Sequence, residues 1–420
     1  MSEQLVPETR TQTCANGLHV VVSRLATTPM VIAHLAVPVR LADRRDLALT
    51  DVLSAAWADT AHSRELEELG GAVTMSRRRQ WVILTLTCQS RHLDVLLRVL
   101  QRTVQGGYTE QVVRRSVAAC LQQSRLVGSH PAIASQRLLW EQVYAQVPSI
   151  MQAAPEPSDF DDIDVADVIA AHARHIVPDS SRLVVVGDVS QDQVMASLEG
   201  MLAGWTKGVG QFGPTESLTA WETSPTVVVL PDDDLPATHI KLAARSLPIS
   251  HPDAFVAASV ASLVLGGNFS SRLNRTIRET EGIAYRAQSY LNDHYNEVLL
   301  VVEADVTNGC AGAAMKQISY LLDDLADHGP TAEELRSAVG YTLGTYILSL
   351  GSQHGRASCL LSYLTMGIGL DFLAQLPDRL DSLTTDDVRD VCQLYRPHLF
   401  AGVVVGNGGT DTRQGEFHYG

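Results

Sequence analysis

The sequence predicts an α+β fold in which two tandem homologous domains each have a mixed sheet covered by helices. A helical stretch, a proline and a Val-rich strand ending in glycine occur in this order twice, once in each half of the chain. Pro178 and Pro397 are 219 positions apart, and Gly187 and Gly406 have the same separation. A repeat at one offset indicates a duplicated unit. The helices also come in runs rather than in strict alternation with strands, which favours α+β layers over a doubly wound sheet.

The first half, residues 1–205, is predicted to fold as one domain. A helix in it is expected to end at Gly70 or Gly71, because glycine readily adopts the left-handed conformation that terminates helices. Later segments carry apolar residues at the spacing of amphipathic helices. In chain order, the expected elements are strands at 17–23 and 30–39, a helix ending near residue 70, paired strands within 74–88, and helices at 93–104, 111–126 and 132–143.

The second half, residues 226–420, is predicted to repeat this plan. Gly282 is expected to end a helix there, as the glycines of the first half do. In chain order, the expected elements are strands at 226–230 and 238–244, helices at 254–265 and 269–281, paired strands within 283–304, and helices at 311–325, 332–350 and 357–364. Residues 206–225, between the halves, begin with a glycine-rich run and lack periodicity, which is typical of a linker.

The composition is that of a globular protein and excludes several classes of function. Hydrophobic residues make up 45% of the 420 residues and charged residues 19%, so a sizeable core can form. The net charge of −15 disfavours nucleic acid and anionic membranes as partners, because both repel an acidic surface. The sequence shows no secretion signal and no apolar run of membrane-spanning length, so we expect a soluble, cytoplasmic protein. The six cysteines are scattered without a C-x-x-C pair, which predicts neither disulfides nor a thiolate zinc site.

One segment of the second half carries a distinctive motif. It reads Gly-Gly-Asn-Phe-Ser-Ser-Arg-Leu over 266–273 and continues through Arg278 and Gly282 to Tyr285. Together with the duplicated plan over nearly the whole chain, this motif resembles the insulinase-like (pitrilysin-type, M16) metallopeptidase family. The length resembles that of the short bacterial members that work as two-chain assemblies. The resemblance implies that the two domains form a crescent, which is half of a clamshell that encloses peptides.

Active members of that family hold a catalytic zinc ion with an H-x-x-E-H helix, in which two histidines bind the metal and the glutamate activates water. This sequence lacks the motif. At the corresponding helix the ligand and base positions fall on Thr50, Leu53 and Ser54, and the family's third ligand, a glutamate, falls near Gln122 or Gln123. Hydroxyl, isobutyl and neutral amide groups cannot replace those ligands, so we expect no metal and no cofactor in this chain.

Other chemical motifs are weak or missing. His172 and His175 lie three positions apart on a predicted helix and could share a metal, but the spacing implies no third ligand. A solvated helix face is the favoured interpretation of this pair. The sequence has no G-x-S-x-G nucleophile elbow and no phosphate-binding loop, and Gly266 and Gly267 are interpreted as turn glycines.

Arg278 and Tyr285 match the arginine and tyrosine that the family supplies from its second half, across from the zinc. The resemblance implies catalysis and substrate binding in trans: a guanidinium and a phenol O–H aimed at a peptide carbonyl oxygen stabilise the negative charge of the transition state. We expect Arg278 in the last turn of a helix, Gly282 at the chain reversal and Tyr285 at the start of a strand, so that both side chains reach one point. The alternative is that Arg278 only complements the helix dipole and that Tyr285 lies in the core.

Arg77 and Arg79 are the candidate substrate-binding residues of the first half. They follow Thr74 and Met75, which occupy the place of an Asn-Ala pair that aligns the substrate backbone in the family. Alternation along a strand places Arg77 and Arg79 on one face, and a face turned toward the peptide would favour acidic substrates. A solvated strand face is the alternative interpretation.

The leading hypothesis is a zinc-free, non-catalytic subunit of a heterodimeric M16-type zinc peptidase, inactive alone. A partner with the H-x-x-E-H motif would bring the zinc, and this chain would bring Arg278 and Tyr285 for the processing of short or precursor peptides. Two alternatives stay open: a structural subunit, as in the core proteins of respiratory complexes, and a homodimeric peptide-binding protein that does not cleave. The sequence does not identify the peptide, the cleavage site or the pathway.

Overall fold

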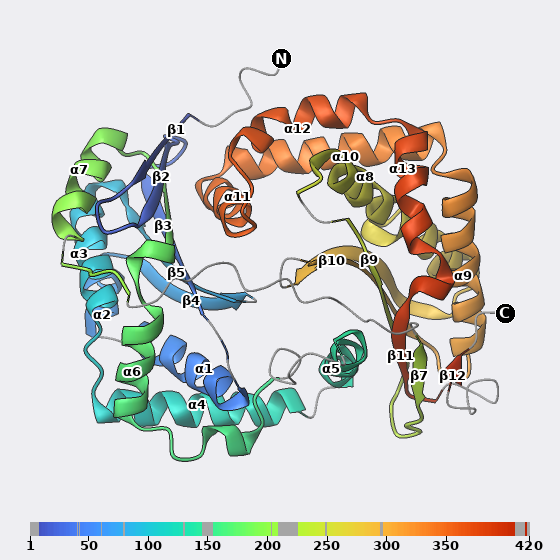
Figure 1. The fold of residues 1–420 in the computed structure, drawn as a ribbon, viewed down its shortest axis with the longest axis horizontal. Coiled ribbons are helices and arrows are strands. Elements are labelled where there is room, and N and C mark those ends of the chain that lie inside the picture. Colours follow the sequence, from blue (N-terminus) through green and yellow to red (C-terminus); the bar gives the residue numbers. More distant parts are fainter. Residues whose placement is uncertain are drawn as a thin grey trace. The chain divides into compact units, whose positions relative to one another are not determined.

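The computed structural model describes residues 8–39, 41, 43–59, 61–78, 80–128, 131–144, 154–202, 204–208, 226–247, 250–294, 297–407 and 416–417. The chain forms two compact units, each built around one six-stranded sheet (Figure 1). The first unit comprises residues 1–126, 155–215 and 345–374, and the second comprises 127–154, 216–344 and 375–420. Both units therefore contain segments from both halves of the chain. Most of the predicted linker at 206–225 lies outside the described residues, so the linker and the domain limits beside it stay predictions.

The first unit contains a sheet of mixed direction. Its strand order is β1-β2-β6-β3-β5-β4, in which β2 and β6 are parallel and the other described pairs are antiparallel. In that order the strands are β1 (Thr9–Thr13), β2 (His19–Arg24), β6 (Arg182–Gly187), β3 (Met30–Pro38), β5 (Trp81–Gln89) and β4 (Ala72–Arg78).

The second unit repeats this topology except at one edge, where the outer strand β12 follows the other strands in the sequence while β1 precedes them. Its strand order is β12-β7-β11-β8-β10-β9, and β7 with β11 forms the parallel pair among otherwise antiparallel described pairs. In that order the strands are β12 (Glu416–Phe417), β7 (Val227–Leu230), β11 (Ala401–Val405), β8 (Thr238–Arg245), β10 (Glu297–Val306) and β9 (Ala284–His294). The α+β fold with two homologous mixed sheets is thus confirmed.

The helix before each repeated strand begins in the same way. Helix α6 (Val165–His175) has Asp164 at its N-cap and α13 (Thr385–Cys392) has Thr384, and both form a capping box with the aspartate three residues later. This reciprocal bonding satisfies backbone N–H groups that the first turn cannot pair. The duplicated sequence therefore preserves the capping box that begins this helix as well as the order of the strands.

In the first unit, helices and sheet share one core. Apolar residues of β2, β3, β5 and β6 pack in it, and Trp57 of the first helix is fully buried there. Most of its helical residues come from α1 (Arg44–Ala58), α3 (Leu93–Gln105), α6 and α7 (Gln191–Met201). Helix α2 (Ala61–Glu67) adds Leu66 and packs on α3 and β4, and α4 (Glu110–Gly128) adds the buried Val113.

Each unit also receives a helix from the other half of the sequence. Helix α11 (Gln353–Thr365) packs on β3 and β6 of the first unit. Helix α5 (Pro131–Val143) packs on β8 and β11 of the second, where Leu139 and Val143 meet Ala243 and Val403 in a separate core. This exchange means that neither half of the sequence contains all the helices that cover its own sheet.

The remaining helices belong wholly or partly to the second unit, and sequence periodicity located most of them. Helices α8 (Pro252–Ser262) and α9 (Ala311–His328) both pack on α13, while α10 (Ala332–Gly351) and α12 (Asp371–Ser382) contain residues of both units. The sequence patterns did not predict α7, α12, which contains Pro377, or the edge strands β1 and β12. None of the helices in the described ranges has the length and apolar character that a bilayer crossing requires.

Gln353 anchors α11 to the first sheet. Its side chain is buried, and its amide nitrogen donates to the carbonyl oxygens of Leu25, Thr28 and Met30 at 2.9, 2.7 and 3.2 Å. We expect Gln353→Ala to lower the free energy of unfolding by about 1–3 kcal/mol, because buried carbonyl groups lose their donor. Urea denaturation of the full chain measures this change. The matched control Gln122→Ala, at an exposed position of α4, should change it by less than about 0.5 kcal/mol; equal effects of both variants would contradict the anchoring role.

His34 of β3 makes the first unit sensitive to acid. It is 4% exposed and its Nδ1 lies 2.8 Å from the Thr85 hydroxyl; burial, and then the nearby His354 and Arg78, lower the pKa of its imidazole to about 4. Its unfolded pKa is about 6.5. Stability is therefore full above pH 6.5 and falls between pH 6.5 and 4, since only the unfolded state takes up the proton.

We expect this loss to approach roughly 3 kcal/mol between pH 7 and 4, and His34→Gln to reduce it. Urea denaturation at a series of pH values measures the dependence. His398→Gln, at an exposed position, is the matched control and should leave the curve as in the wild type. An identical pH dependence in the His34 variant and the wild type would contradict the assignment.

Candidate functional site

The motif segment of the second unit begins where helix α8 continues directly into a π-helical segment. After Ser262 the helix widens into a π-helical turn (Leu263–Gly267), a short turn follows, and a second π-helical stretch covers Asn274–Thr280. A Cβ atom on Gly266 would lie 2.4 Å from the backbone nitrogen of Ser289 in β9. Only glycine therefore permits this close packing. The interpretation of Gly266 and Gly267 as turn glycines is wrong, because both lie within the π-helical segment.

A buried guanidinium fixes this segment to two other helices. Arg272, whose side chain is 8% exposed, binds both carboxylate oxygens of Glu334 at 2.9 and 2.7 Å and one oxygen of Asp324 at 2.8 Å. It also donates to the carbonyl oxygen of Gly329 at 3.1 Å. The partners come from α9, from the residue that follows it and from α10, so the guanidinium joins the motif segment to both helices.

The carboxylate of Glu334 is held in its charged form by these contacts. Burial alone raises the pKa of this group, but the hydrogen bonds and charge of Arg272, with the hydrogen bonds of Thr331, lower it to about 2. The ordinary value is 4.5. Because the folded value is depressed, the stabilisation is present above about pH 4.5 and is lost as the pH falls toward 2.

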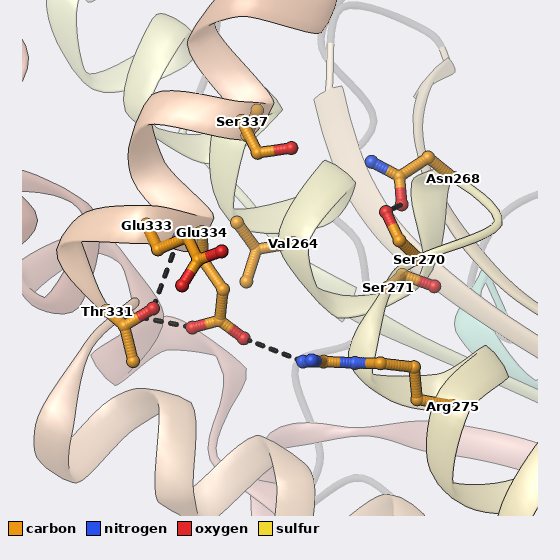
Figure 2. Close-up of a pocket in the computed structure, with 10 residues that line it drawn as sticks. Val264, Asn268, Ser270, Ser271, Arg275, Thr331, Glu333, Glu334 and Ser337 are labelled. Carbon is orange, nitrogen blue, oxygen red and sulfur yellow. Dashed lines mark hydrogen bonds and ion pairs between the residues drawn. The ribbon is translucent and has the colours of Figure 1, made fainter.

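A polar hollow of about 360 Å³ lies between the turn at residues 268–271 and the start of α10 (Figure 2). Asn268, Ser270 and Ser271 form one wall, and the opposite wall includes Thr331 and Glu334. Figure 2 shows the ion pair that crosses it, in which Arg275 reaches Glu334 at 3.1 Å. Glu334 is therefore bound by both Arg272 and Arg275, whereas Glu333, the other carboxylate that lines the hollow, is exposed.

Arg278 and Tyr285 occupy the local positions that the sequence predicts. Arg278 lies in the last turn of the second π-helical stretch, Gly282 has a φ of +66° and reverses the chain, and Tyr285 is the second residue of β9. Tyr285 is 87% exposed, so the alternative that places it in the core is wrong. Arg278 is also exposed, and its guanidinium carbon lies 5.1 Å from the centre of the Phe269 ring. A common point reached by both side chains stays a prediction.

The residues that the family resemblance assigns to the metal-binding helix, Thr50, Leu53 and Ser54, lie on α1, and their side chains do not fit a metal. Thr50 and Leu53 are each 1% exposed. The Thr50 hydroxyl donates to the carbonyl of Asp46 and the Ser54 hydroxyl to that of Thr50, both at 2.8 Å. Both hydroxyls are thus used within their own helix, and Leu53 fills part of the core. Gln122 and Gln123 are exposed on α4, and no group of three or more His, Cys, Asp or Glu side chains in the described ranges could hold a metal ion.

Arg77 of β4 is paired with an acid on this same helix. Its Nε lies 2.7 Å from a carboxylate oxygen of Asp51, which adjoins Thr50. Burial raises the pKa of Asp51, and Arg77 opposes that rise. The charge of Arg77 is therefore matched within the protein, while Arg79 lies outside the described residues. Thr74 is exposed, and Met75 packs partly buried against the core.

The two histidines of α6 do not form a solvated helix face, so that interpretation is wrong. His175 is 1% exposed, and burial lowers its pKa to about 4. His172 donates from Nε2 to the carbonyl oxygen of Val104 at 3.1 Å and accepts the Tyr108 hydroxyl at Nδ1 at 2.7 Å. Their shared role is packing of α6 against the first core, and sequence spacing alone could not distinguish it from metal binding.

Comparison with known proteins identifies relatives of this chain. The family model described as the peptidase M16 inactive domain matches residues 162–340. An uncharacterized zinc protease of Mycobacterium leprae is 29% identical over 238 residues, which are 56% of this chain and 53% of that protein. An uncharacterized zinc protease of Streptomyces coelicolor is 34% identical over 143 residues, 33% of this chain and 30% of that protein. The matches thus span about half or less of the length of these relatives.

Solved structures share the fold at lower sequence identity. A protease from Helicobacter pylori has a TM-score of 0.87 at 18% identity, over 95% of this chain and all of that chain. The peptidase M16 inactive domain from Pseudomonas fluorescens has a TM-score of 0.85 at 19% identity, over 95% of this chain and 98% of that chain. The two-sheet α+β architecture is therefore that of M16-like proteins.

The buried guanidinium gives a prediction for stability. We expect Arg272→Ala to lower the free energy of unfolding by about 3 kcal/mol, because it leaves Glu334 and Asp324 without their main counter-charge. Urea denaturation at pH 7 measures the loss. Arg275→Ala is the matched control: Arg275 also binds Glu334 but is half exposed, so its loss should be less than about 1 kcal/mol. Similar losses in the two variants would show that burial does not set the strength of this contact.

Proposed function

We propose that this chain, a member of the M16 inactive-domain family, is the zinc-free subunit of a heterodimeric M16-type zinc peptidase. In this proposal it is inactive alone and supplies Arg278 and Tyr285 to substrate held by a partner subunit. The substrates are short or precursor peptides. A cytoplasmic location is part of the same proposal.

One contrast between the two units supports the proposal. In the first unit, the positions that the resemblance assigns to two zinc ligands and the general base hold Thr50, Leu53 and Ser54, whose side chains are buried or bonded within α1. In the second unit, Arg278 and Tyr285 are exposed and have no hydrogen-bond or ion-pair partner among the described residues. The chain thus lacks the groups that would activate water but presents the groups that could stabilise the reacting carbonyl.

The chemistry of peptide hydrolysis gives these two side chains a defined task. Attack on a peptide carbonyl places negative charge on its oxygen, and donors aimed at that oxygen stabilise the transition state more than the ground state. A guanidinium supplies charge and several N–H donors, and a phenol supplies one O–H donor. Zinc held by the partner would activate the attacking water and polarise the carbonyl.

A homodimeric peptide-binding or scaffold protein is the second candidate, because a first unit without metal ligands suits it equally. Purification of the tagged full chain from its source separates the two. The proposed function predicts a second chain with an H-x-x-E-H motif at one to one and about one zinc ion per pair. Elution of this chain alone or with itself, without zinc, would favour the second candidate.

The role of Arg278 can be measured in the assembled complex. We expect Arg278→Ala to reduce turnover of a quenched fluorescent peptide by on the order of 10²–10³, the cost of removing one oxyanion donor. Tyr285→Phe should also reduce turnover, since it removes only the hydroxyl. Arg275→Ala and Tyr320→Phe are matched controls at an ion-paired arginine and another exposed tyrosine, and both should keep nearly full turnover. Full turnover in the Arg278 variant, with the complex intact, would overturn the assignment.

A further inference from the structure

Phe269 is a large apolar side chain in an unusual place. It lies on the turn between the two π-helical stretches and is 67% exposed. Burial in a core therefore does not explain its presence. Its one ring contact among the described residues is with Arg278, whose guanidinium carbon lies 5.1 Å from the ring centre. This separation is within the range of a cation–π interaction.

Arg278 differs from the other two arginines of the same stretch. Arg272 and Arg275 both bind Glu334, whereas no carboxylate in the described ranges pairs with Arg278. A salt bridge would orient the guanidinium but would occupy its N–H donors. A stacked ring orients the guanidinium through its face and leaves the in-plane N–H groups free to donate to another molecule.

The turn that carries Phe269 is itself held on both sides. The side-chain amide of Asn274 donates to the carbonyl of Asn268 at 2.9 Å, and the backbone N–H of Ser271 reaches the same carbonyl at 3.3 Å. Figure 2 shows Asn268, Ser270 and Ser271 in succession along the same wall of the hollow. Arg272 follows directly and is fixed by its ion pairs. The backbone that carries the ring is thus held by hydrogen bonds to the Asn268 carbonyl before it and by the ion pairs of Arg272 after it.

We propose that Phe269 is a positioning residue: its ring holds the guanidinium of Arg278 in one orientation while leaving its donors free for a peptide carbonyl oxygen. This inference rests on the proposed function for the role of Arg278, but the stacking itself does not. The ring makes no contact with the reacting atoms in this scheme. Its contribution is to reduce the number of side-chain conformations that Arg278 must give up when substrate is bound.

The orientation can be tested on the full chain without any partner or substrate. In protein labelled with ¹⁵N-arginine, the Nε–H resonance of Arg278 is assigned by its disappearance in Arg278→Lys. We expect this proton to be shifted upfield by the Phe269 ring, to return toward the ordinary position in Phe269→Leu, and to stay shifted in Phe269→Trp. Phe269 is exposed, so both variants should fold. An unchanged resonance in Phe269→Leu would overturn the stacking.

The kinetic consequence is tested in the complex, with the quenched fluorescent peptide that the wild-type complex cleaves best in a library screen. Phe269→Leu should lower kcat by about two- to five-fold, the effect of an exposed cation–π contact, with little change in KM. Phe269→Trp should restore kcat, and Phe269→Leu should have no further effect in an Arg278→Ala background. Wild-type kcat in Phe269→Leu, while Arg278→Ala is slow, would overturn the positioning role. Wild-type kcat in Arg278→Ala would instead refute the proposed function. The Nε–H chemical shift of Arg278 would still test its contact with Phe269.

Discussion

The buried guanidinium of Arg272 is the interaction on which the candidate site of the second unit depends. A charge removed from water is tolerated only when nearly all of its donors are satisfied, and this one has two carboxylates and a backbone carbonyl within 3.1 Å. Those partners belong to α9, the residue after it and α10. The motif segment is therefore fixed at Arg272, and the turn before it and the helical stretch after it inherit that position. Phe269 and Arg278 lie on either side of this one fixed point.

Around helix α1 of the first unit, the polar side chains are paired within the protein. Two hydroxyls on α1 bond to carbonyl groups of their own helix, and Arg77 neutralises Asp51. Leu53 occupies core volume that a polar ligand could take only with a partner. These residues leave no potential metal ligand buried without a partner. Their packing therefore does not depend on a metal ion. The two homologous sheets thus support regions with different chemical character.

The sequence could predict the parts of this structure that local patterns encode. Repeated proline and glycine landmarks predicted two sheets of one topology, and Gly282 predicted the chain reversal between Arg278 and Tyr285. It could not predict that α5 and α11 pack on the sheet of the other half, because periodicity shows that a helix has an apolar face but not which surface covers it. The ion pair of Arg77 with Asp51 and the stacking of Arg278 on Phe269 were also missed, since each joins residues from different elements or turns and depends on their relative orientation.

The family resemblance points to two groups of residues, one on α1 of the first unit and one around Arg278 of the second. Exposure to solvent distinguishes these two groups. Thr50 and Leu53 are inaccessible, so a peptide could not contact them without opening α1 from its core. Arg278, Tyr285 and Phe269 are exposed, and the N–H donors of Arg278 and the hydroxyl of Tyr285 have no partner among the described residues. Side chains whose polar groups are not used up by contacts within their own chain are the ones whose chemistry is available to another molecule. That availability, together with the family motif, is the reason to look for a binding role in the second unit rather than around α1 of the first.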